Sequence, residues 1–194
     1  MLTELITIKS RLALVVTDYD DILSAAIKAV SARFDKETNR TLARTTAITD
    51  EFNSGDTEIP VSCYPIEAVT KFETKSNETD GWSEQTGIEY LIRRACVISL
   101  PSPLSSLRSS ARLARVTYTG GYVLPGTAPD PGQTPLPDAL EQACIEQVAY
   151  WFRNRDKSGL IRSWPHQGTY EVFIQSDLLP EVRAVLKKFE RYTL

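Results

Sequence analysis

Apolar residues recur at helical spacing in four stretches of the chain. In the clearest of them, Leu140, Cys144, Val148 and Phe152 occupy every fourth position after Pro137, which predicts a helix with one apolar face. Neighbouring alanines widen this face, so we expect this helix to lie at the centre of a bundle. By the same criterion, the chain should contain helices over about 8–15, 21–37, 137–154 and 178–191.

A two-residue period replaces the helical one in the middle of the chain, over about 44–119. Residues 68–74 alternate apolar and polar side chains, as a half-buried strand does. Asn53-Ser54-Gly55-Asp56 is typical of a turn between two strands, and Val116-Thr117-Tyr118 is the last strand-like run. We therefore expect a small, largely antiparallel sheet inserted between helices.

The strand-rich region ends at a sharp turn. Gly120 and Gly121 follow the last strand-like run, and we interpret them as a structural turn because glycine tolerates positive φ. Residues 124–137 then contain five prolines and two glycines, a composition that predicts an extended loop. The expected fold class is α+β: a helical bundle with an inserted small antiparallel β-sheet, in a single domain over residues 1–194.

The composition argues against several classes of protein. The net charge is −3 over 194 residues, which disfavours a broad basic face for gripping nucleic acid. No apolar run is long enough to span a bilayer, and the N-terminus lacks the basic-then-apolar pattern of a secretory signal. We expect a protein made in the cytoplasm, without a membrane partner.

No stretch of the chain carries a recognisable catalytic or metal-binding motif. Cys63, Cys96 and Cys144 are far apart, which favours buried reduced thiols over disulfides or a zinc site. The single histidine, His166, has no nucleophile motif or second metal-spaced histidine beside it, and no glycine-rich stretch has P-loop spacing. We therefore predict no catalytic residue, no cofactor, no metal and no enzymatic activity.

Four groups of short motifs follow one another along almost the whole chain. They are Leu5-Ile6-Thr7 with Asp20-Asp21-Ile22-Leu23 and Asn39-Arg40-Thr41-Leu42; Val61 with Tyr64-Pro65-Ile66; Val116-Thr117-Tyr118-Thr119-Gly120-Gly121-Tyr122 with Leu136-Pro137; and Leu178-Leu179-Pro180 with a final Arg191-Tyr192. Their order and spacing resemble the head-to-tail connector (adaptor, or head completion) proteins of tailed bacteriophages, including prophage and gene-transfer-particle relatives.

The resemblance implies a structural virion protein that forms a ring between the portal and the tail machinery, joins head to tail and continues the DNA channel. The ring would contain twelve copies. Its partners would be the portal protein, a tail-side stopper or tail-completion protein, and DNA that passes through the lumen without sequence-specific binding. The protein would be made in the bacterial host cytoplasm and reside at the head–tail interface of the virion.

The resemblance also assigns a contact segment. Family members dock their C-terminal segment on the portal, so the portal contacts carried over to this chain are Arg191, Tyr192, Thr193 and Leu194. The loop over 124–137 is longer than the family usually has, and its role stays open.

Two other functions remain as alternatives. A small enzyme or ligand-binding protein could combine His166 with carboxylates from elsewhere in the chain, and would need a concave pocket with convergent polar groups. A DNA-binding regulator could use a helix-turn-helix near residues 20–40, although the acidic start of that helix offers few side chains for reading bases.

Overall fold

The computed structural model describes five parts of the chain: residues 1–104, 113–157, 162–163, 171–172 and 177–191. These parts form two compact units. The first, the helical unit, contains Met1–Thr38 and Leu136–Glu190, and the second, the β-rich unit, contains Asn39–Pro135 and Arg191. Each unit is described by itself.

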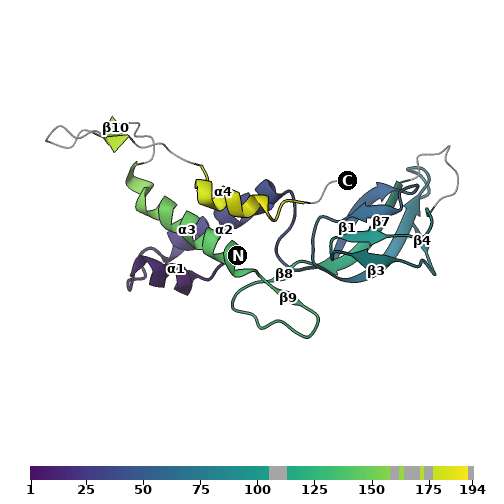
Figure 1. Ribbon diagram of the computed structural model, residues 1–194, viewed down its shortest axis with the longest axis horizontal. Helices are drawn as coiled ribbons and strands as arrows, with labels where there is room; N and C mark the ends of the chain where they lie inside the picture. The colour runs from purple at the N-terminus through teal and green to yellow at the C-terminus, as the bar shows by residue number, and fades with distance from the viewer. Residues whose placement is uncertain (105–112, 158–161, 164–170, 173–176, 192–194) are drawn as a thin grey trace. The chain divides into compact units, whose positions relative to one another are not determined.

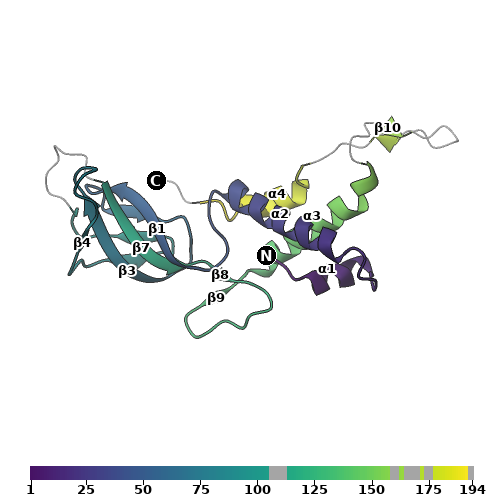
Figure 2. The ribbon, with the colours of Figure 1, turned by 180° about the vertical axis from the view of Figure 1, so that it is seen from behind.

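The helical unit is organised around its third helix, α3. Figure 1 and, from behind, Figure 2 show α3 beside the other helices, and it contacts all three of them. Leu140, Cys144, Val148 and Phe152, the apolar positions that predicted this helix, are all buried. The helical elements are α1 (Leu5–Leu12), α2 (Asp20–Thr38), α3 (Asp138–Arg153), the short 3-10 helix η1 (Arg155–Lys157) and α4 (Pro180–Lys187). A two-stranded pair, β10 (Arg162–Ser163) and β11 (Glu171–Val172), belongs to the same unit.

Local sequence signals explain where these helices begin. Asp20 and Asp21 lie in the first turn of α2, where carboxylates stabilise the positive end of the helix dipole. Pro180 opens α4, a position where the missing N–H removes no intrahelical hydrogen bond. The two long helices lie within one residue of the expected 21–37 and 137–154, whereas α1 begins three residues before the expected position. Residues 20–38 form one uninterrupted helix, so a helix-turn-helix is not formed there.

The β-rich unit contains two antiparallel sheets and one short parallel pair. The larger sheet has the strand order β1-β7-β3-β4, and the smaller one has the order β2-β6-β5. The strands are β1 (Thr45–Asn53), β2 (Glu58–Pro60), β3 (Ile66–Lys75), β4 (Ser83–Gln85), β5 (Leu91–Arg93), β6 (Val97–Ser99), β7 (Leu113–Gly120), β8 (Tyr122–Val123) and β9 (Thr134–Pro135). The parallel pair joins β8 to β9.

Both antiparallel sheets contribute side chains to one apolar core. Ile59 on β2 and Ile98 on β6 are buried together with Phe72 on β3 and Val116 on β7. Tyr118 is also fully buried in this core, and its hydroxyl group has to be satisfied there because an unpaired polar group in an apolar core is destabilising. It accepts a hydrogen bond from the backbone N–H of Cys63 (2.9 Å) and donates one to Asp50 Oδ2 (2.8 Å).

The other face of the larger sheet carries a row of charges. Glu73 on β3 lies opposite Arg115 on β7, and the guanidinium group donates two hydrogen bonds to the carboxylate, at 2.8 and 3.1 Å. Lys71 forms a second ion pair with Glu73, at 3.1 Å. The centre of the Trp82 ring lies 4.2 Å from the guanidinium carbon of Arg115. The hydrogen bonds from Arg115 are the main cause of the lowered pKa of Glu73.

The expected helical bundle with a small inserted sheet is wrong. The segment between α2 and α3 builds two sheets around a core of its own, so it is a compact unit rather than a minor insertion. The helices are also unequal, since α1 and α4 have eight residues each and α3 has sixteen. The protein is a mixed α and β fold divided between these two units.

Candidate functional site

Three backbone segments of the β-rich unit meet close to the point where the chain enters it: residues 40–44, 62–66 and 120–123. We call this meeting point the joint. Four backbone hydrogen bonds connect the segments with donor–acceptor distances of 2.8 or 2.9 Å: Thr41 to Ser62, Tyr122 to Leu42, Arg44 to Tyr122 and Gly121 to Pro65. Motifs that are far apart in the sequence therefore lie together in the folded unit.

The glycine pair makes this close approach possible. A Cβ atom on Gly120 would lie 2.6 Å from the carbonyl oxygen of Cys63 and 2.8 Å from that of Pro65. A Cβ atom on Gly121 would lie 2.6 Å from the carbonyl oxygen of Ala43, and its φ of +101° also disfavours a side chain. All three of these oxygens are backbone atoms, so no side-chain rotation could relieve the overlap.

Arg40 is stacked on tyrosines inside the joint. Its guanidinium carbon lies 3.2 Å from the centre of the Tyr64 ring and 5.3 Å from that of Tyr122. The side chain is almost fully buried and donates a hydrogen bond to the Tyr64 carbonyl oxygen. Burial raises the pKa of the Tyr64 hydroxyl, and the nearby Arg40 charge partly opposes this rise. A buried cation held by aromatic faces and a carbonyl stabilises one arrangement of the three segments.

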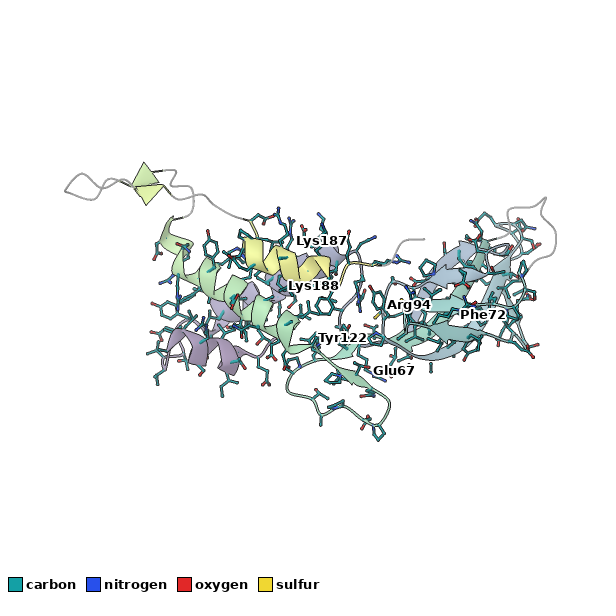
Figure 3. The ribbon with its side chains drawn as sticks, in the orientation of Figure 1. Glu67, Phe72, Arg94, Tyr122, Lys187 and Lys188 are labelled. Atoms are coloured by element: carbon teal, nitrogen blue, oxygen red, sulfur yellow. The ribbon has the colours of Figure 1, made fainter. Side chains whose placement is uncertain are left out.

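The proline-rich loop has a closed base and a hydrogen-bonded turn beside it. The β8·β9 pair closes the base. In the turn that leads into β9, Gln133 N–H donates to the Asp130 carbonyl oxygen and Asp130 N–H donates to Gln133 Oε1, both at 3.0 Å. Arg44 in the joint donates two hydrogen bonds to Glu67, which is labelled in Figure 3, at 2.8 and 2.9 Å. These bonds are the main cause of the raised pKa of Arg44, and the charge of Asp130 adds to the rise. The expected loop is therefore a folded projection of the β-rich unit.

The C-terminal segment begins at a polar groove of the β-rich unit. Arg191 Nη2 donates a hydrogen bond of 2.8 Å to the Pro60 carbonyl oxygen. The groove has a volume of about 390 Å³, and Glu51, Asp56 and Glu58 line it together with Arg191. The other expected portal contacts, Tyr192, Thr193 and Leu194, lie outside the described residues.

The described residues offer little for catalysis. His166 lies outside them, and within the described ranges no group of three or more His, Cys, Asp or Glu could hold a metal ion. Burial raises the pKa of Cys96, and that of Cys144 to about 12, so these thiols stay protonated and are poor nucleophiles at neutral pH. No helix in the described part of the chain is long and apolar enough to cross a membrane.

Sequence reasoning did not find the stacked arginine. It placed Arg40, Tyr64 and Tyr122 in three separate motifs, and their spacing carries no helical or strand period that would bring them together. The usable signal was the glycine pair at 120–121, which marks a position where other backbone comes close.

A family model described as "Head completion protein" matches residues 2–192. A chain from the neck of an empty GTA particle with C6 symmetry has a similar fold, with a TM-score of 0.60 and 13% identity over 100% of this chain and 91% of that chain. A comparison with curated proteins returned no match.

Two further solved structures are similar over nearly the whole chain. A chain in the virion of a native gene transfer agent (GTA) particle has a TM-score of 0.58 and 13% identity, covering 100% of this chain and 91% of that chain. A chain from the neck of a native GTA particle with C12 symmetry has a TM-score of 0.51 and 14% identity, covering 98% and 89%. At these identities, the similarity concerns the fold.

Proposed function

Because the chain belongs to the head completion protein family, with a structural role at the head–tail connection, we propose that it forms a ring between the portal and the tail machinery. The ring joins the head to the tail and continues the DNA channel. The observation that carries this proposal is the family match over residues 2–192. The fold similarity to neck chains of GTA particles supports it.

The proposed assembly is a ring of twelve copies. A ring forms when one surface of a subunit binds a different surface of the next and the repeated rotation closes. The similar chains come from necks with C6 and C12 symmetry, and twelve copies would satisfy both. Both compact units would belong to each subunit, acting as one connector domain over residues 1–194.

The proposed lumen lets DNA slide. Tight binding of duplex DNA requires many cationic contacts to phosphate, and a subunit with a net charge of −3 supplies no overall excess of them. The duplex would pass without sequence-specific binding. The protein would act as a non-enzymatic component of the virion neck after synthesis in the bacterial host cytoplasm.

The proposed partners are the portal on one side and a tail-side stopper or tail-completion protein on the other. The portal contacts would be Arg191, Tyr192, Thr193 and Leu194. The hydrogen bond from Arg191 to Pro60 supports this choice, because it holds the start of the segment at a defined place on the β-rich unit.

Native mass spectrometry tests the proposal. The purified protein is measured alone and mixed with portal rings from the same particle. We expect a closed ring, or the addition of about one connector copy per portal subunit, since a portal ring offers a template for the interfaces. A wild-type protein that neither assembles nor adds to the portal would refute the proposal.

A truncated variant tests the contact segment. A chain ending at Glu190 should fold with an unchanged melting temperature of the helical unit but lose portal binding. The matched control is Thr127→Ala, which changes an exposed residue of the proline-rich loop and should bind like the wild type. Full portal binding by the truncated chain would remove the C-terminal segment from the proposal and leave the connector role intact.

A further inference from the structure

The smaller sheet of the β-rich unit has an apolar edge. In the order β2-β6-β5, strand β5 is the edge strand, and among the described residues it pairs only with β6. Leu91 and Ile92 on this strand are 67% and 40% exposed, and the preceding Tyr90 is 38% exposed. An edge strand with exposed apolar side chains and unpaired backbone groups is a surface on which another chain can dock.

Cations follow these apolar residues. The Arg93 side chain is 61% exposed and forms an ion pair with Glu58 at 3.0 Å. Arg94 is exposed in the turn after β5 (Figure 3) and forms no ion pair with any described residue. We call residues 90–94 the edge patch. Its centre is apolar, and its basic character comes from Arg94 at its C-terminal end, because Glu58 already neutralises Arg93.

A second apolar surface lies on the helical unit, in the α1–α2 connection and the first turn of α2. Val15 is 92% exposed, Val16 50% and Ile22 52%. Asp18 and Asp21 are exposed beside them in the sequence and form no ion pair with any described residue. We call these five residues the α1–α2 patch.

Asp20, which lies between Asp18 and Asp21 in the sequence, is already paired. Lys9 forms an ion pair with Asp20 at 2.7 Å, which neutralises Asp20 within the helical unit. The acidic character of the α1–α2 patch therefore comes from Asp18 and Asp21, both of which face solvent.

We propose that the edge patch of one subunit docks on the α1–α2 patch of the next subunit, a second copy of this chain. This inference rests on the proposed ring. A closed ring requires two different and complementary surfaces on each copy. The two patches meet that requirement. Both contain exposed aliphatic side chains, and the edge patch adds a positive charge where the α1–α2 patch adds negative charges.

Charge also selects this pairing over a symmetric one. Two α1–α2 patches brought together would place Asp18 and Asp21 of both copies near one another, whereas the edge patch offers Arg94, a cation without an ion pair among the described residues. Like charges brought together at an interface oppose association, whereas opposite charges favour it and set its register. The heterologous contact is the one in which the aliphatic centres are buried without this repulsion.

Cross-linking between two single-cysteine variants tests the contact. Ile22→Cys and Leu91→Cys proteins are mixed in equal amounts, with portal rings present, and treated with a short bismaleimide. The three native cysteines are buried, so the introduced thiols should dominate the reaction. Because each variant carries one new cysteine, an Ile22-to-Leu91 product forms only between two copies.

The matched control replaces one partner. Thr70 on β3 is exposed and lies outside both patches, so Thr70→Cys mixed with Ile22→Cys reports random encounters. We expect the Ile22–Leu91 pair to cross-link at least tenfold faster than this control, and faster than either variant with itself. Adding Arg94→Glu to the Leu91→Cys protein should slow the reaction, and adding Asp21→Lys to the partner should restore it.

The outcomes separate this inference from the proposed function. Cross-linking at the control rate would overturn the patch pairing even if native mass spectrometry finds rings on the portal, and those rings would then use other surfaces. Faster cross-linking of one variant with itself would overturn it in favour of a symmetric contact. Specific cross-linking without portal binding would support the patch pairing and count against the connector role.

Discussion

Replacing Gly120 by alanine should destabilise the β-rich unit strongly, although the change adds only one methyl group. The new Cβ would lie 2.6 Å and 2.8 Å from the backbone oxygens of Cys63 and Pro65, well inside van der Waals contact. Those backbone segments would have to move apart. This movement would lengthen two hydrogen bonds: the one from Gly121 N–H to the Pro65 carbonyl oxygen (2.9 Å) and the one from Cys63 N–H to the Tyr118 hydroxyl (2.9 Å).

The expected loss of stability follows from these contacts. Overpacking of a tight site costs about 1–3 kcal/mol, and two weakened hydrogen bonds add about 0.5–1.5 kcal/mol each. The lower entropy of an alanine in the unfolded chain offsets about 0.4–1 kcal/mol. We therefore expect a net decrease of about 1–6 kcal/mol, with a midpoint of roughly 3 kcal/mol, in the free energy of unfolding of the β-rich unit.

Alanine substitutions at three other glycines distinguish the cost of atomic overlap from the cost of backbone strain. Gly55 has open space and no positive φ, so Gly55→Ala should change stability by less than about 1 kcal/mol. Gly132 has open space but a φ of +94°, so Gly132→Ala should cost about 1–2 kcal/mol from strain alone. Gly121 combines a φ of +101° with a 2.6 Å approach, and Gly121→Ala should be the most damaging of the four.

Urea unfolding and amide hydrogen exchange measure the effect. Circular dichroism during unfolding gives the free energy, and exchange of the Gly121 and Tyr122 amides reports the joint itself. If Gly120→Ala loses no more stability than Gly55→Ala and keeps both amides protected, the three segments do not approach as closely as described, and the reasoning fails.

Three further predictions concern single groups. Tyr118→Phe removes the hydroxyl that pairs with Asp50 and the Cys63 N–H, so calorimetry should find a loss of about 1–3 kcal/mol; an unchanged melting temperature would contradict this. Arg115 lowers the pKa of Glu73 below its ordinary 4.5, so Glu73 stabilises the fold above that pH and stops doing so as the pH falls through the lower, folded pKa. Glu73→Gln should therefore be less stable than wild type at pH 7, with the difference in melting temperature shrinking below pH 4.5; a constant difference would refute the pairing. Burial raises the pKa of Cys144 to about 12, so iodoacetamide at pH 8 should label this thiol in urea but not in the folded protein, as peptide mass spectrometry would report.

Local patterns in the sequence located most secondary structure. The helices α2 and α3 lie within one residue of the expected ranges because their apolar residues repeat with the helical period. Strand β7 ends at the glycine pair, as the Thr-Gly-Gly run indicates. The family was also indicated by the order of short motifs, and the match over residues 2–192 confirms that resemblance.

The fold class was mispredicted because periodicity is a local property. Alternation over residues 68–74 identifies β3 but does not say how many strands share one core. Ile59, Ile98 and Val116 belong to three strands that are distant in the chain, and only their packing turns the middle segment into a unit of its own. Burial of apolar surface drives this packing and has no direction along the sequence.

By itself, the sequence determined the two long helices, the family and the absence of a recognisable catalytic motif, since each depends on neighbouring residues. Only the tertiary structure decided the division into two units and the stacking of Arg40 on Tyr64 and Tyr122. The same holds for the hydrogen bond from the Tyr118 hydroxyl to Asp50. It also decided which apolar residues stay exposed on β5 and in the α1–α2 connection. The physical reason is that burial and long-range hydrogen bonds depend on where the rest of the chain lies, which no short stretch of sequence encodes.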